Sequence, residues 1–203
     1  MYRNDQSFYY TIGSFNQKFR TNPGICILNY NIRSFAKNSI NLESLLDSLD
    51  TKPSVIVLTE TFLNSSNATL FKMSHYRHVS SYNPDERNGG VSIFVSTDIE
   101  FKSVDVLSSF TRNMEMCSVE LQLFAGPVVI VAVYRLHGGN IVEFDGELEE
   151  ALQSSCIASK KVYVVGDFNI DLMKHEDSHT INFVSTMQSH SFVPLITLSL
   201  IHI

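Results

Sequence analysis

The chain of 203 residues has few cysteines, no long apolar run and no excess of basic residues. Its three cysteines are odd in number and widely spaced, which argues against a disulfide framework and matches no zinc pattern. No apolar run approaches the roughly 20 residues that span a bilayer, and the N-terminus lacks the apolar stretch of a secretory signal. We therefore expect an intracellular protein without a membrane partner, with Cys26 and Cys117 as buried free thiols.

The net charge of −6 and the pI of about 5.6 argue against a protein that holds nucleic acid by bulk electrostatic attraction, because such proteins are basic. A nuclease that makes few phosphate contacts through a metal-centred cleft is still compatible with this charge. The hydrophobic content of 44% can supply a sizeable core, and the length suits one domain.

Hydrophobic periodicity predicts a mixed α/β protein with two packed sheets and helices outside them. Residues 1–24 are expected to be a lead-in segment, and Asn38 is expected to cap a helix that ends at Lys52-Pro53. Two more helices are expected, one with Phe144, Leu148, Ala151 and Leu152 on one face, and one from Ser178 with Ile181, Val184 and Met187 inward. The expected strands are 25–31, 55–60, 91–95, 100–107, 116–123, 128–134 and 162–169.

Four of these strands end on a side chain that can hold a metal ion or a phosphate. The groups at the four ends are Asn29 with Asn31, then Glu60, then Tyr134, then Asp167 with Asn169. Ligands of α/β proteins collect beyond the ends of strands, and strand residues two apart point to the same side. The pattern therefore predicts one site for a hard metal ion and a phosphoester.

Magnesium prefers oxygen ligands, keeps several waters, and needs only one or two carboxylates besides a substrate phosphate. Glu60 is then the best ligand, supported by Asn29, while Asp167 would orient or deprotonate the attacking water. Asn169 and Tyr134 would donate hydrogen bonds to the phosphate as its negative charge develops.

Each residue also has an ordinary structural interpretation. Glu60 could be a solvated strand end, Asn29 and Asn31 polar residues of an edge strand, and Tyr134 a buried aromatic with a satisfied hydroxyl. The segment 166–169 could be a plain turn. All four explanations would have to hold at once, so we favour the site.

These segments resemble the successive motifs of the endonuclease/exonuclease/phosphatase superfamily, and more narrowly the apurinic-type endonuclease domain of non-LTR retrotransposon polyproteins. The resemblance runs from about Ile25 to Thr197 and rests on 28–31 (LNYN), 58–61 (LTET), 87–93 (RNGGVSI), 133–135 (VYR), 144–152 (FDGELEEAL), 165–171 (VGDFNID) and 191–197 (SFVPLIT). It implies a four-layer α/β sandwich and cleavage of one DNA strand with Mg²⁺ (or Mn²⁺), which primes a reverse transcriptase encoded downstream. An active enzyme of this kind would work in the nucleus.

The resemblance places Asn29 and Glu60 at metal-binding positions and Tyr134, Asp167 and Asn169 at catalytic ones. It makes Asn31 and Arg135 possible contacts to phosphate or DNA, although the loop 135–137 (RLH) departs from the usual family sequence.

The superfamily pattern continues past Thr197 through further strands to a late Asp and a Ser-Asp-His, which this chain lacks. We therefore expect 25–197 to be an incomplete domain that lacks its last strands and is inactive as this fragment. Residues 198–203 read like the translation of a transposase adapter used in sequencing libraries, and we expect them to be a non-native tail. Two alternatives stay open: a phosphomonoesterase of the same superfamily that acts on inositol phosphates or small phosphate esters, and a non-catalytic relic.

Overall fold

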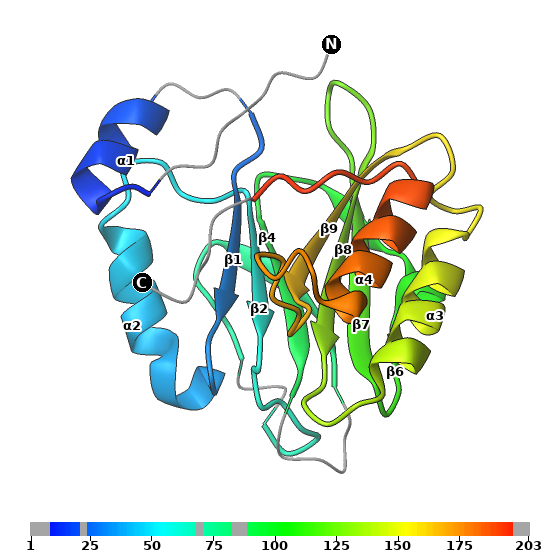
Figure 1. Ribbon diagram of the computed structural model, residues 1–203. Helices are drawn as coiled ribbons and strands as arrows, with labels where there is room; N and C mark the ends of the chain where they lie inside the picture. Colours follow the sequence, from blue (N-terminus) through cyan, green and yellow to red (C-terminus); the bar gives the residue numbers. More distant parts are fainter. Residues whose placement is uncertain (1–8, 21–23, 68–70, 83–88, 197–203) are drawn as a thin grey trace.

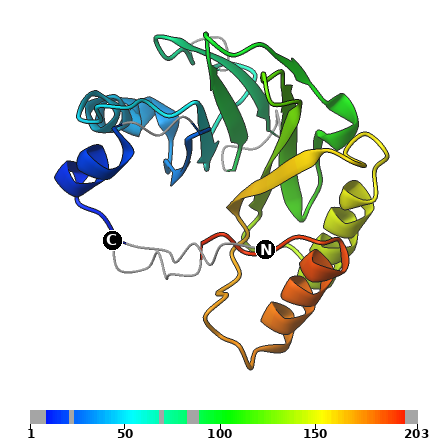
Figure 2. The ribbon, with the colours of Figure 1, turned by 90° about the horizontal axis from the view of Figure 1, so that it is seen from above.

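Two β-sheets face each other, and helices cover the outer side of each sheet (Figures 1 and 2). The computed structural model describes residues 9–20, 24–67, 71–82 and 89–196. The expected sandwich of two mixed sheets flanked by helices is confirmed. The expected tail 198–203 lies outside the described residues, as do Arg87 and Asn88 of the glycine-containing motif, and the absence of further strands stays a prediction.

The first sheet has the strand order β1-β2-β4-β3. Its strands are β1 (Ile27–Asn31), β2 (Val55–Thr59), β3 (Tyr76–Ser81) and β4 (Val91–Ser96). Strands β1 and β2 are parallel because helix α2 (Phe35–Asp47) connects them, and β4 is antiparallel to both of its neighbours. Leu42 and Leu46 of α2 are buried against the outer face of this sheet, where they meet Ile56 and Leu58.

The second sheet has the order β5-β7-β8-β9, and the short strand β6 also pairs with β7. The elements of this half are β5 (Phe101–Ser103), the 3-10 turn η2 (Asp105–Leu107), β6 (Ser109–Phe110), β7 (Met114–Leu121), β8 (Val128–Arg135) and β9 (Lys161–Asp167). Helix α3 (Ile141–Leu152) makes the parallel crossover from β8 to β9, and α4 (Ser178–Ser189) follows β9. Phe144, Leu148 and Phe183 of these helices form the outer core of the sheet.

The inner core lies between the sheets and follows from the alternation of side chains along the strands. Every second residue of β2 and β4 meets its counterparts from β7 and β8, as in the completely buried set Val57, Ile93, Val119 and Ile130. Cys117 is buried in this core as expected, whereas Cys26 is only partly buried, and all three cysteines are free.

Several details differ from the sequence expectation. The expected strand 100–107 is wrong in its second half, because Phe101–Ser103 forms β5 and Asp105–Leu107 forms a 3-10 turn. The lead-in segment contains a helix, α1 (Ile12–Phe19), which Thr11 caps and which Asn16 ties to Ser48 and Asp50. Asn38 does not cap α2, since the helix begins at Phe35 and the Asn38 amide binds carbonyl groups of the preceding corner. The inward position expected for Ile181 is wrong, because this side chain is 51% exposed while Thr180 and Phe183 are buried.

The longest described helix, α2, has 13 residues, and no described helix combines the length and apolar character that a membrane crossing needs.

An ion-pair cluster lies near the C-terminal end of β7, where Glu120 is buried on the outer face of the sheet. Its carboxylate binds Lys160 at 2.6 Å and Lys102 at 3.2 Å. The hydrogen bonds from Lys160, Gln122 and Lys102 lower the pKa of Glu120 to about 2. The folded state therefore prefers the ionised carboxylate.

We expect this preference to make stability depend on pH. The unfolded carboxyl has a pKa of about 4.3, so the contribution of Glu120 is complete above about pH 5 and is lost as the pH falls toward 2. Glu120→Gln should lower the free energy of unfolding at pH 7 by about 1–3 kcal/mol and make the loss between pH 5 and 3 smaller. Urea unfolding at pH 7, 5 and 3 measures both effects.

The matched control is Glu100→Gln, because Glu100 forms an exposed pair with Arg77 and its side chain is 78% accessible. Such pairs contribute about 0–1 kcal/mol. Equal pH profiles for the Glu120 variant and the parent would contradict the prediction.

Candidate functional site

The strand ends that carry the expected site residues lie at one end of the sandwich. In Figure 1 the arrowheads of β1, β2, β8 and β9 all point toward the lower edge of the molecule. The register pairs Asn31 with Thr59 in the first sheet and Tyr134 with Asp167 in the second. The two parallel pairs therefore deliver their carboxyl ends to one place, as the sequence predicted.

Asn31 joins the two carboxylates of the site. Its Nδ2 donates to Glu60 Oε1 at 2.7 Å and to Asp167 Oδ2 at 3.1 Å. Its Oδ1 accepts the backbone N–H of Arg33 at 3.2 Å, which fixes the side chain at the exit of β1. Two negative groups from different sheets are thus held within reach of a single amide nitrogen, an arrangement that a bound cation would stabilise.

Asn29 lies one step deeper along β1 and makes a different contact. Its Nδ2 donates to the carbonyl of Gly166 at 2.9 Å, so it links β1 to β9 across the two sheets. Its Oδ1 is buried and has no hydrogen-bond partner. Buried oxygens are seldom left without a partner, and an amide oxygen is a ligand that Mg²⁺ accepts. The metal-binding role expected for Asn29 stays a prediction, while the carboxylates themselves are bridged by Asn31.

The site residues offer oxygen donors, which suit a hard cation. Within the described ranges, no three His, Cys, Asp or Glu side chains gather into a metal-binding group. The oxygens of Glu60, Asp167 and Asn29 are the hard donors that Mg²⁺ prefers, and the remaining positions of an octahedral ion are usually water or substrate oxygens. The donor set therefore fits a magnesium or manganese ion that shares its coordination with a phosphate.

Tyr134 is buried at the end of β8, with only 4% of its surface accessible. Burial, the negative charges of Glu60, Asp167 and Glu115, and a hydrogen bond with Glu60 raise the pKa of its hydroxyl far above the ordinary value. The proton therefore stays on the oxygen at neutral pH. Tyr134 can act in this site as a hydrogen-bond donor.

Asp167 and Asn169 are held by a tight turn after β9. The Asp167 Oδ1 accepts the backbone N–H of Asn169 at 3.0 Å, and Asn169 adopts a left-handed conformation with φ +49°. The Asn169 Nδ2 donates to the carbonyl of Arg135 at 2.7 Å. An amide nitrogen carries a second hydrogen, which the phosphate contact expected for Asn169 would use.

Arg135, the last residue of the neighbouring strand β8, also binds the turn after β9. Its Nε donates to the Phe168 carbonyl at 2.7 Å and its terminal nitrogen to the Asn169 carbonyl at 2.6 Å. The guanidinium therefore fixes the turn that presents Asp167. The contact with phosphate or DNA that the sequence suggested for Arg135 stays a prediction, and it would have to use the remaining N–H groups.

The sequence analysis missed Glu115, and it placed Gly166 in the exit turn of its strand without the reason for glycine there. Glu115 is 1% exposed and lies directly opposite Tyr134 in the β7–β8 pairing. It shares the inward alternation of Cys117, Val119 and Leu121, and a carboxylate at such a position was a usable signal because buried charges need specific partners. A Cβ at Gly166 would overlap the carbonyl of Val133, which the motif could not reveal without the position of β8.

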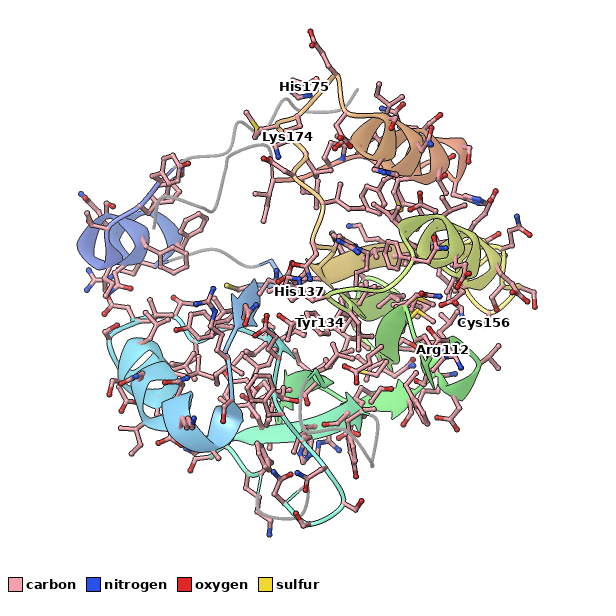
Figure 3. All side chains as sticks on the ribbon, turned by 60° about the horizontal axis from the view of Figure 1, so that its bottom comes forward. Arg112, Tyr134, His137, Cys156, Lys174 and His175 are labelled. Carbon is pink, nitrogen blue, oxygen red and sulfur yellow. The ribbon has the colours of Figure 1, made fainter. Side chains whose placement is uncertain are left out.

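Two basic side chains of the loop after β9 lie away from the site. Figure 3 shows Tyr134 near the middle of the molecule, with Lys174 and His175 on the outlying loop after β9. Both are exposed, as are His137 and Arg112. Arg135 is the basic side chain that contacts the turn of the site directly.

The two asparagines of β1 can be distinguished by cation binding. Asn31→Ala removes the link between the carboxylates, and we expect it to lower Mn²⁺ affinity by about 10–100-fold, the usual effect of losing a group that orients metal ligands. Asn29→Ala should have a comparable effect only if its unpartnered oxygen is a ligand. Electron paramagnetic resonance titration of Mn²⁺ measures both affinities, and Asn182→Ala at an exposed position of α4 serves as the control. Unchanged affinity in the Asn31 variant would contradict the site geometry.

Comparisons with known proteins agree with this architecture. Residues 28–182 match the sequence profile described as Endonuclease/Exonuclease/phosphatase family. A comparison of the sequence with curated proteins finds no match.

Several solved structures share the fold at low sequence identity. The endonuclease domain of TRAS1, a telomere-specific non-LTR retrotransposon, superposes with a TM-score of 0.60 and 16% identity, over 82% of this chain and 71% of that one. A Neisseria 3′ phosphatase, NExo, bound to product DNA hairpin gives 0.57 and 20% over the same shares. An AP endonuclease from Archaeoglobus fulgidus gives 0.57 and 12%, again over 82% and 71%.

Proposed function

Since the chain belongs to the Endonuclease/Exonuclease/phosphatase family, we propose that it is a divalent-metal-dependent phosphodiesterase that nicks one strand of DNA, as the endonuclease domain of a non-LTR retrotransposon. The observation that carries the proposal is the Asn31 amide between Glu60 and Asp167, which gathers two carboxylates where a cation and a phosphate can meet. The reverse transcriptase of such an element would follow in the same polyprotein, and the enzyme would act in the nucleus.

Glu60, with Asn29, would hold the cation, and Asn31 would orient Glu60 and Asp167. When bound, Mg²⁺ or Mn²⁺ supplies charge that polarises the phosphate and assists ionisation of water. Asp167 would orient the attacking water and accept its proton, and the support for this role is that its carboxylate is held by Asn31 and by the turn after β9. The protonated Tyr134 and the Asn169 amide would donate hydrogen bonds to the phosphate as negative charge develops on its oxygens.

We propose DNA as the substrate and the retrotransposon branch of the family because of two sequence motifs and because of a similar solved structure. The segments 58–61 (LTET) and 165–171 (VGDFNID) resemble the retrotransposon branch, and the TRAS1 domain shares the fold. Likeness at this level of identity supports the fold alone, so substrate and branch are part of the proposal.

A phosphomonoesterase is the second candidate, because the family description includes phosphatases and the Neisseria structure is titled as a 3′ phosphatase. The same carboxylate, amide and phenol groups would serve either reaction. The two reactions differ in whether the phosphate is a diester or a monoester, which a comparison of substrates can identify.

The test uses two forms of the protein, residues 1–203 and an extended form in which residues 1–197 continue into the reading frame of the genomic locus. Each form is incubated with Mg²⁺ and either supercoiled plasmid or inositol phosphates. The proposal expects the extended form to convert plasmid to relaxed circles, and the shorter form to be much less active if further strands are needed. Release of inorganic phosphate from inositol phosphates with intact plasmid would favour the phosphatase, and cation binding without either reaction would favour a non-catalytic relic.

A further inference from the structure

A buried carboxylate links the two sheets at the end of the sandwich that carries the site. Glu115 belongs to β7 of the second sheet, is 1% exposed, and points between the sheets like Cys117 and Val119. Taking a carboxylate out of water is costly unless hydrogen bonds replace its hydration. The hydrogen bonds that compensate this cost therefore indicate which segment of the chain Glu115 holds in place.

The partner in the first sheet is Gly90, whose backbone N–H donates a short hydrogen bond to Glu115 Oε2. Gly89 and Gly90 both have left-handed backbones, with φ +86° and +88°. A Cβ built on Gly89 would lie 2.8 Å from the same carboxylate oxygen, and one on Gly90 would collide with the Thr61 hydroxyl. Glycine is thus required at both positions for the carboxylate and the chain to approach this closely.

The carbonyl groups of these glycines hold the segment that follows β2. Gly90 accepts the N–H of Thr61 at 3.1 Å, and Gly89 accepts the N–H of Phe62 at 2.8 Å. Glu60 comes directly before this pair and is itself in a left-handed conformation, with φ +52°. On its other side, the Glu60 carbonyl accepts the N–H of Ser34 at 2.7 Å.

The backbone of Glu60 is therefore fixed from two directions, by the corner after β1 and by the glycine pair. A left-handed conformation of a residue with a side chain is strained and persists only where the surroundings enforce it. The glycine pair is part of that enforcement, and Glu115 anchors the glycine pair to the second sheet.

We propose that Glu115 is a positioning residue of the site: through Gly90 it holds the glycine pair and the segment after β2 so that Glu60 faces Asp167. This inference rests on the proposed function in one respect only, that Glu60 binds the cation. Glu115 itself is not placed in the cation's coordination.

Two readouts separate positioning from a general contribution to stability. The first is Mn²⁺ affinity. Glu115→Leu removes the acceptor for Gly90, and we expect affinity to fall by about 10–100-fold, the range for residues that support metal ligands. Glu115→Gln keeps an oxygen of similar shape for the Gly90 N–H and should stay within about threefold of the parent. Gly89→Ala displaces the carboxylate from the other side and should resemble Glu115→Leu.

The second readout is amide hydrogen exchange, which does not depend on a cation. In Glu115→Leu, exchange at Thr61 and Phe62 should accelerate by at least about tenfold relative to the amides of β2, because local opening governs exchange at such positions. Glu120→Leu is the matched control: it removes another buried glutamate of β7, at the far end of the strand, and should lower stability without changing either readout.

The outcomes are distinct. Parent-like exchange at Thr61 and Phe62 in both Glu115→Leu and Gly89→Ala would overturn the inference, whatever the cation result. Faster exchange with Mn²⁺ binding that Glu60→Gln does not affect would support the anchoring role of Glu115 and count against the proposed function. Faster exchange together with weaker binding supports both.

Discussion

Replacing Asp167 with Asn should lower the rate of plasmid nicking by the extended form by about 10²–10⁴-fold, the usual effect of removing a positioned acid–base group. The substitution keeps an oxygen for the Asn169 N–H, so the turn after β9 can persist, but it removes the charge that accepts the proton of water. Glu60→Gln should have a similar effect, because a neutral amide is a weaker ligand for a divalent cation than a carboxylate. Single-turnover nicking of supercoiled DNA measures both rates.

The same variants should not lose stability in the absence of cations. Glu60 and Asp167 are two negative groups that contact one amide, and their repulsion is relieved when either becomes neutral. The melting temperature of each variant without metal should therefore equal or exceed that of the parent, as is common where a site is destabilised for function.

Asp171→Asn provides the control for the Asp167 experiment. Asp171 lies four residues along the same loop, and its Oδ1 accepts the N–H of Met173, a contact that asparagine can keep. Nicking should stay within about twofold of the parent for such a surface substitution. An Asp167→Asn variant that nicks as fast as this control would contradict the catalytic role of Asp167.

Gly166→Ala should be among the most damaging single substitutions in the chain. Gly166 has φ +151° and lies opposite Val133 in the β8–β9 pairing, where an added Cβ would overlap the Val133 carbonyl. Strain at such a position, with displacement of β9 from β8, is expected to lower the free energy of unfolding by about 2–4 kcal/mol. The next pair in the register is Tyr134 with Asp167, so any displacement also separates two site residues. Urea unfolding and Mn²⁺ titration measure the two consequences.

Gly146→Ala is the matched control for this substitution. Gly146 lies within α3, and a Cβ built there meets no atom within 4 Å. Alanine should stabilise the helix by about 0.5–1 kcal/mol, because it restricts the unfolded chain more than glycine does. If the Gly166→Ala protein is as stable as the parent, the prediction is wrong, because β9 must then be able to move away from β8 without loss of stability.

The local pattern of the sequence was enough to predict most elements and the approximate place of the site. Alternating or continuous apolar residues located β2, β4, β7, β8 and β9, and the spacing of Phe144 and Leu148 located α3. The polar groups at the ends of four strands were predicted to meet, and Asn31, Glu60 and Asp167 do meet. Such inferences succeed because the alternation of side chains along a strand and along a helix face depends on the local backbone alone.

Local pattern could not decide where α2 begins. The N–H groups of Ser34 and Phe35 bind the carbonyls of Glu60 and Thr61, so the helix starts at Phe35 because of a segment 25 or more residues away. The strand β3 was missed for a similar reason. Its own sequence shows no clear alternation of apolar residues, and it is a strand because it pairs with β4.

The division of roles within the site was also a tertiary matter. The sequence by itself determined which hard oxygen donors are available and that they stand at strand ends. Only the packing of the two sheets decided that Asn31 rather than Asn29 bridges the carboxylates and that Glu115 reaches Gly90. The pairing of β8 with β9 within one sheet decided that Arg135 holds the turn after β9. The physical reason is that each of these hydrogen bonds joins residues more than 20 positions apart. The partner of a buried group is therefore set by which strands and sheets come together and not by the residues beside it in the chain.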